Sequence, residues 1–201
     1  PAHGIDLTGC FLMPGLIMSH IHLMDCFDAF NDERLKKWLE AGFTTLRDEG
    51  ILSYATLEEA VRWRERLVND VTRPSIAVCG HFLSTVGGYG GAEPIGLSSD
   101  QEARDAVRRM CDLGVDHFKT ALDSGFDAYS QSLPLLSEAI LTAICDEAHK
   151  HGKKVSAHVN SATQLAILVR AGIDEAAHAC ADRLPNELLQ EMVNRHVAMT
   201  P

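Results

Sequence analysis

The chain lacks several features that would place it in a special class of protein. Its six cysteines form no C-x-x-C pair, its basic residues form no cluster, and no apolar run approaches the ~20 residues of a membrane helix. Lys and Arg (18) are outnumbered by Asp and Glu (28), which gives a formal net charge of −10. A small disulfide scaffold is thereby excluded, and neither a membrane nor a nucleic-acid partner is expected, because a phosphate backbone needs clustered cations.

What remains is the composition of an ordinary globular protein. Hydrophobic residues make up 46% and charged residues 23% of the 201-residue chain, which are close to average values. The scattered cysteines indicate reduced thiols, and the first residues show no signal-peptide pattern. We therefore expect one soluble domain in the cytoplasm.

Short apolar runs alternate with amphipathic segments along the chain. Helices are predicted at residues 31–41, 56–70, 99–113, 136–151, 161–171 and 185–194. An apolar run at residues 11–19 precedes strands predicted at 43–46, 75–79, 115–120, 155–158, 173–177 and 197–200. Ser99 and Glu102 have the spacing of a capping box.

This alternation indicates a parallel sheet covered by helices, because the strands are apolar nearly throughout. About six βα units and the start of a seventh fit two α/β architectures. One is an open doubly wound sheet. The other is a (β/α)₈ barrel of the TIM type, incomplete here because a full barrel normally needs about 250 residues.

Polar residues stand at the carboxyl ends of the predicted strands, where α/β proteins place function. They are His20, His22, Lys119 with Asp123 nearby, His158 and His178. If the sheet closes, these side chains converge on one mouth, and convergent imidazoles are what a metal site requires.

The chain contains two H-x-H pairs, which differ in their setting. His20 and His22 follow an apolar strand, where residues two apart share a face. His149 and His151 lie at the end of a predicted helix, where such residues point apart, so we expect this second pair to face solvent.

Lys119 allows two interpretations from the residues alone. Its ammonium group could extend to water from the end of a strand, or its neutral amine could be carboxylated by CO₂ and bridge two metal ions. His117 lies two residues before Lys119, on the same face of the predicted strand but farther from its end. We predict that it is a buried histidine with satisfied hydrogen-bond partners.

The glycine-rich residues 80–96 contain neither the G-x-x-x-x-G-K-[ST] pattern nor a G-x-G-x-x-G that opens a helix, which are the usual phosphate-binding patterns. We therefore expect a mobile, substrate-facing loop and no bound nucleotide. A serine nucleophile is unsupported because no G-x-S-x-G elbow is present.

Several segments together resemble the amidohydrolase superfamily. Residues 9–23 (GCFLMPGLIMSHIHL) are similar to its opening, in which a strand with Pro-Gly leads to a metal-binding H-x-H. Residues 42–50 (GFTTLRDEG) resemble its G-x-T-T-x-R-D segment. The segments VDHFKTALDSG, EAHKHGKKVSAHV and AGIDEAAHA follow in the order of the family. The nearest branch resembles the imidazolonepropionase and prolidase-like group.

This resemblance implies a (β/α)₈ barrel with one or two divalent metal ions, usually zinc, at its mouth. His20 and His22 would hold the more buried ion, while His158 and His178 would hold the more exposed one. Lys119, as a carbamate, would bridge the two ions.

The implied reaction is hydrolysis of an amide-type C–N bond in a small molecule such as a dipeptide or a cyclic amide. A metal-bound hydroxide would attack the carbonyl, and an aspartate from strand eight would carry the proton to the leaving nitrogen. The alternatives are an esterase or phosphotriesterase-like activity, since the same hydroxide attacks those centres, and a metal-binding fragment without catalysis.

The chain departs from the pattern of this branch in two respects. Tyr89 (GGYGG) stands where the branch usually has histidine, so we consider both Tyr89 and His81 as substrate-binding residues. The sequence also reaches only the start of strand seven, and the aspartate expected on strand eight is not among these residues.

We accordingly expect residues 1–9 to be a remnant of a small β-sandwich domain and residues 10–201 a partial barrel. Unpaired strand edges would then favour a homo-oligomer or completion by a further C-terminal portion.

Overall fold

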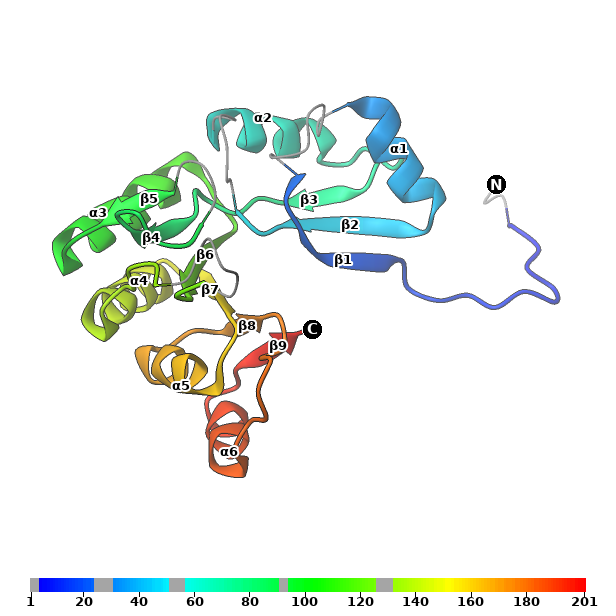
Figure 1. Ribbon diagram of the computed structural model, residues 1–201. Helices are drawn as coiled ribbons and strands as arrows, with labels where there is room; N and C mark the ends of the chain where they lie inside the picture. Colours follow the sequence, from blue (N-terminus) through cyan, green and yellow to red (C-terminus); the bar gives the residue numbers. More distant parts are fainter. Residues whose placement is uncertain (1–3, 24–30, 51–56, 91–93, 126–131) are drawn as a thin grey trace.

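The computed structural model describes residues 4–23, 31–50, 57–90, 94–125 and 132–201 (Figure 1). Its elements, in chain order, are β1 (Leu16–Ile21), α1 (Asp32–Glu40), β2 (Phe43–Asp48), α2 (Leu57–Leu67), β3 (Ser75–Ala77), β4 (Leu83–Thr85), β5 (Ile95–Leu97), α3 (Asp100–Leu113), β6 (His117–Leu122), α4 (Glu138–Lys150), β7 (Lys154–Val159), α5 (Ala162–Ala171), β8 (Glu175–Ala177), α6 (Asn186–Asn194) and β9 (Ala198–Thr200). The predicted alternation of strands and helices is confirmed.

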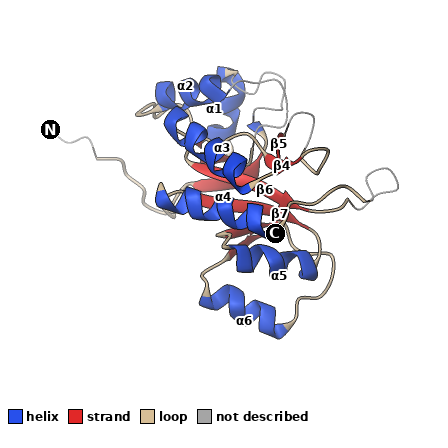
Figure 2. Cartoon of the chain, turned by 90° about the vertical axis from the view of Figure 1, so that its left-hand side faces the viewer, coloured by secondary structure: helices blue, strands red, loops and turns tan. Residues whose placement is uncertain are grey.

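All the strand pairs are parallel, and the strands form two sheets. One sheet has the order β1-β2-β3 and the other β5-β4-β6-β7-β8-β9. A single parallel bridge between Cys79 and His117 connects the chain beyond β3 to the start of β6, so the two sheets form one curved row. Helices lie along the outer side of this row (Figure 1), with α3 to α6 stacked in sequence (Figure 2).

The strand order distinguishes the two architectures predicted above. Apart from the inserted β4 and β5, the order follows the chain from β1 to β9 without a reversal, whereas a doubly wound sheet reverses at a switch point. The order is therefore that of a (β/α)₈ barrel. The described strands do not close into a ring, because β1 and β9 each have one neighbour.

The core lies between the row of strands and the helices. Strand β6 is buried along its whole length, and α4 buries Leu141 and Ile144 against neighbouring elements. Full burial on both faces explains the nearly continuous apolar strands in the sequence. The core consequently holds the carboxyl ends of the strands in fixed positions.

Serine side chains begin three of the helices. Ser99, Ser137 and Ser161 each accept a hydrogen bond from a backbone N–H in the first turn of α3, α4 and α5, which satisfies one of the unpaired amides at each helix start. The capping box predicted at Ser99 is present in part, because Glu102 accepts from the N–H of Ser98 and not from that of Ser99. Thr56, the first residue of the second predicted helix, lies outside the described residues.

Two predicted segments differ from the structure. Residues 80–96 are not simply a loop, because β4 and the first residues of β5 fall within them and Leu83 pairs with Thr120. Strand β1 begins at Leu16, after Pro14 and Gly15, and not within the preceding apolar residues. Residues 4–15 form no helix or strand and extend away from the body (Figure 1).

None of the helices in the described ranges is long and apolar enough to cross a membrane.

Candidate active site

A cavity of 390 Å³ is lined by residues that lie in, or just after, strands β1, β6, β7 and β8. It is lined by His20, His22, Phe82, Gly88, Tyr89, Gly90, Lys119, Leu133, His158 and His178. The structure thus brings together all five predicted metal ligands and Tyr89, from segments far apart in the sequence.

The H-x-H pair is supported by the end of β2. His20 lies within β1, and His22 follows its last residue. The carboxylate of Asp48 accepts a hydrogen bond from the N–H of Leu23 at 2.8 Å, and the Nδ1 atom of His22 lies 3.1 Å from the carbonyl oxygen of Gly50. Because a carbonyl oxygen only accepts, Nδ1 of His22 carries the proton and Nε2 carries the lone pair.

His20 places an imidazole nitrogen in the interior without a hydrogen-bond partner. Its Nδ1 atom is buried and has none in this structure. Burial, and then the nearby positive charge of Lys119, lower the pKa of His20 to about 3. The ring is therefore neutral at neutral pH, and its buried nitrogen is suited to an additional ligand.

His158 and His178 come from the next two strands of the sheet. His158 lies in β7, and burial lowers its pKa to about 4 although the neighbouring carboxylate of Asp123 opposes the shift. His178 follows β8 with φ of 81°, in the left-handed region, and donates its backbone N–H to the carbonyl oxygen of Thr200 at 2.7 Å. Burial also lowers the pKa of His178. Strained backbone of this kind concentrates at functional sites.

The imidazole rings lie against one another. The ring centroids of His20 and His178 are 4.5 Å apart, and those of His158 and His178 are 5.0 Å apart. Within the described ranges, no group of three or more His, Cys, Asp or Glu side chains is arranged to hold a metal ion. The donor chemistry nevertheless fits one, because imidazoles are typical metal ligands and the rings of His22 and His158 each have one nitrogen already engaged.

Lys119 is buried, and the interpretation in which its ammonium reaches water is wrong. Strand β6 continues to Leu122, so Lys119 lies inside the strand with 1% of its surface exposed. Its Nζ atom donates to the Oε2 atom of Glu49 at 3.0 Å. A buried ammonium without a counter-ion would be very costly, and Glu49 supplies the compensating charge.

Glu49, which the sequence analysis did not single out, is the centre of a buried charge cluster. Its Oε1 atom lies 2.9 Å from Nη1 of Arg47 and 3.3 Å from Nε2 of His117, and Arg47 also pairs with Glu175 at 2.6 Å. Burial by itself would raise the pKa of Glu49, but His117, Lys119 and Arg47 together hold it well below its usual range. Glu49 directly follows the observed β2, but the strand predicted from the sequence ended three residues earlier, at residue 46.

His117 is buried as predicted, and its Nε2 atom faces Oε1 of Glu49 at 3.3 Å without the geometry of a regular hydrogen bond. Both His149 and His151 are partly exposed, as expected for the second H-x-H pair, and His149 pairs with Asp174 at 2.8 Å.

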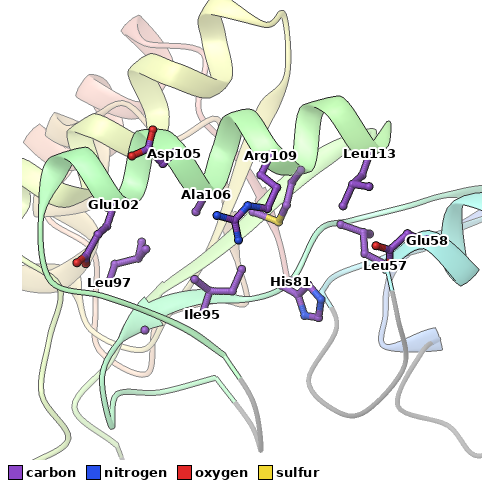
Figure 3. Close-up of a pocket in the computed structure, with 12 residues that line it drawn as sticks. Leu57, Glu58, His81, Ile95, Leu97, Glu102, Asp105, Ala106, Arg109 and Leu113 are labelled. Carbon is purple, nitrogen blue, oxygen red and sulfur yellow. The ribbon is translucent and has the colours of Figure 1, made fainter.

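His81 lies apart from the histidine cavity. It lines a second cavity of 560 Å³ between α3 and the start of α2, together with Leu57, Ile95 and Arg109 (Figure 3). Tyr89 and His81 are therefore placed in different cavities, and only Tyr89 is beside the imidazoles.

Comparison with known proteins identifies the family. The family model described as the amidohydrolase family matches residues 11–191. The chain belongs to the amidohydrolase family. The chain is 27% identical, over its whole length, to uncharacterized proteins of Mycobacterium bovis and Mycobacterium tuberculosis, of which the alignment covers 53%.

Solved structures show the same fold. The chain is 32% identical to a putative prolidase from Bifidobacterium longum, with a TM-score of 0.71 over 90% of this chain and 43% of that one. It is 26% identical to a crystal structure described as an amidohydrolase, with a TM-score of 0.73 over 100% of this chain and 55% of that one. The chain therefore spans about half the length of the relatives that it matches.

Proposed function

We propose that the intact protein is a metal-dependent hydrolase that cleaves amide-type C–N bonds in small substrates. The observation that carries the proposal is the convergence of His20, His22, His158 and His178 in one cavity. Membership of the amidohydrolase family and the likeness to a putative prolidase support the class of bond.

The four histidines would hold one or two divalent ions, of which zinc suits imidazole ligands well. His22 offers Nε2 and His158 offers Nδ1, because the other nitrogen of each ring is already engaged. When bound, the ion would polarise a carbonyl group and acidify a water molecule. Lowered pKa values keep His20, His158 and His178 neutral, which is the form that binds a metal.

Lys119 belongs to the proposed set only as a carbamate, since an ammonium group has no lone pair to offer. The ammonium of Lys119 would first leave its ion pair with Glu49 and lose a proton. The neutral amine would then join its Nζ atom to the carbon of CO₂ and release a second proton, which leaves an anionic carbamate. The imidazoles are thus the part of the site that requires no covalent change.

The remaining walls of the cavity set the size and character of the substrate. Phe82, Tyr89 and Leu133 provide apolar and aromatic surface beside the imidazoles, in a volume of 390 Å³. Such a volume is at the lower end for small-molecule sites. A dipeptide or a small cyclic amide is the substrate class that we propose.

Elemental analysis of protein purified without chelator tests the proposal. We expect at least one equivalent of zinc, manganese or iron per chain, and loss of that metal in the double variant His20→Asn/His22→Asn. The matched control is His149→Asn/His151→Asn, which removes the same motif from the surface and should retain the metal. A folded wild-type protein that takes up no added zinc would refute the proposal. Release of amine from N-acyl amino acids and dipeptides then identifies the substrate.

A further inference from the structure

We infer that Asp123 is a positioning residue for His158, and this inference deepens the function proposed above. The Nε2 atom of His158 lies 2.8 Å from Oδ2 of Asp123. Both side chains are buried, with 3% of Asp123 and 6% of His158 exposed. The role of Asp123 is to fix the proton of the imidazole on Nε2, so that Nδ1 presents its lone pair.

The carboxylate determines which nitrogen carries the proton. An ionised carboxylate only accepts hydrogen bonds, so the Nε2 atom of His158 must donate. A neutral imidazole has one N–H, and Nδ1 is then the acceptor. Asparagine at position 123 would remove this constraint, because its amide can present either an oxygen or an N–H to the ring.

The carboxylate is itself held in place. Oδ2 of Asp123 also accepts from Nδ2 of Asn160 at 2.7 Å, and Oδ1 accepts from the N–H of Gly125 at 2.9 Å. Three donors, from His158, Asn160 and Gly125, therefore engage both oxygens. Such a carboxylate has little freedom to rotate, and its bond to His158 keeps a defined direction.

Tyr89 restrains the face of the His158 ring, whereas Asp123 restrains its edge. Its aromatic ring stacks on His158 with centroids 4.0 Å apart and planes 11° apart. A flip of the imidazole about its Cβ–Cγ bond would exchange the positions of its ring atoms and break the bond to Asp123. Stacking and hydrogen bonding together thus hold Nδ1 in one orientation, as outer-shell partners of metal-binding histidines do.

The inference is tested by NMR on metal-free protein, through long-range ¹⁵N–¹H correlations of the histidine side chains at pH 7.5. The His158→Gln variant assigns the signals. We expect the Nε2–H tautomer for His158 in the wild-type protein, and a shift toward Nδ1–H in Asp123→Asn. A wild-type ring with the proton on Nδ1 would overturn the inference without any variant.

Zinc affinity provides a second readout. Asp123→Asn should weaken zinc binding about 10–100-fold, and Asp123→Glu should restore part of the loss. The control is Asp116→Asn, which removes a carboxylate that accepts from Val78 and Arg64 away from the cavity. It should reduce stability without changing the tautomer or the affinity.

Unchanged tautomer and unchanged zinc affinity in a folded Asp123→Asn protein would refute the role of Asp123. If the wild-type protein binds no zinc, the proposed function fails, whereas the tautomer of His158 still decides the role of Asp123.

Discussion

The buried ion pair between Lys119 and Glu49 gives a quantitative test of the site's architecture. Replacing Glu49 with glutamine keeps the shape of the side chain but removes its charge. The ammonium of Lys119, 1% exposed and 3.0 Å from the carboxylate, would lose its counter-ion. Arg47 would keep a partner, because it also pairs with Glu175 at 2.6 Å.

The expected cost is large compared with the stability of a domain. Removing one partner of a buried ion pair costs about 3–5 kcal/mol, whereas replacing both partners by apolar groups is often nearly neutral. Natural domains unfold with only about 5–15 kcal/mol. We therefore expect Glu49→Gln to lose about 3–5 kcal/mol, a large part of the total, and Glu49→Gln/Lys119→Met to recover most of that loss.

Urea unfolding followed by circular dichroism, at pH 7.5 with chelator, measures these free energies. The exposed pair of Arg170 and Glu138, 2.9 Å apart, is the matched control, and Glu138→Gln should cost less than about 1 kcal/mol. The reasoning is refuted if Glu49→Gln unfolds within about 0.5 kcal/mol of the wild-type protein, which is the range of ordinary surface substitutions. It is also refuted if the double variant is no more stable than the single one.

Three further predictions concern other parts of the molecule. The metal-free protein should lose stability as the pH falls from 6.5 towards 4, because burial lowers the pKa of His158 in the folded protein to about 4 and the unfolded chain therefore takes up the proton first. Urea titrations at several pH values measure this loss, and the free energy of unfolding of His158→Gln should depend less steeply on pH. Gly172→Ala should cost about 1–2 kcal/mol by thermal unfolding, since Gly172 ends α5 with φ of 102°, and an equal stability would contradict that backbone assignment. Ser161→Ala should cost about 0.5–2 kcal/mol by removing the cap of α5, whereas Ser161→Asp should retain it.

Local patterns in the sequence predicted most of the secondary structure because they report local physics. Serine before an amphipathic run marked the start of α3, since its hydroxyl satisfies an amide of the first turn. Apolar runs marked the buried parallel strands, since such strands are covered on both faces. The start of β1 and the inserted β4 were missed, because Pro14 with Gly15 and the glycine-rich segment weaken these signals.

In the candidate site, the histidines could be predicted from the sequence, whereas their contacts could not. His20, His22, His158 and His178 could be selected because each stands at the end of a strand, and the parallel arrangement brings those ends to one edge. Their hydrogen-bond partners could not be assigned, because Asp123 meets His158 and Gly50 meets His22 across strands that only the folded sheet places side by side.

By itself, the sequence determined the α/β class, the family resemblance and the candidate metal-binding residues, because periodicity, motifs and strand-end positions are properties of short segments. The tertiary structure alone decided that Lys119 is buried against Glu49, that Tyr89 covers His158, and that His81 lies in another cavity. These facts depend on strand register and on the packing of distant segments, since burial, charge pairing and ring stacking exist only once those segments are in contact.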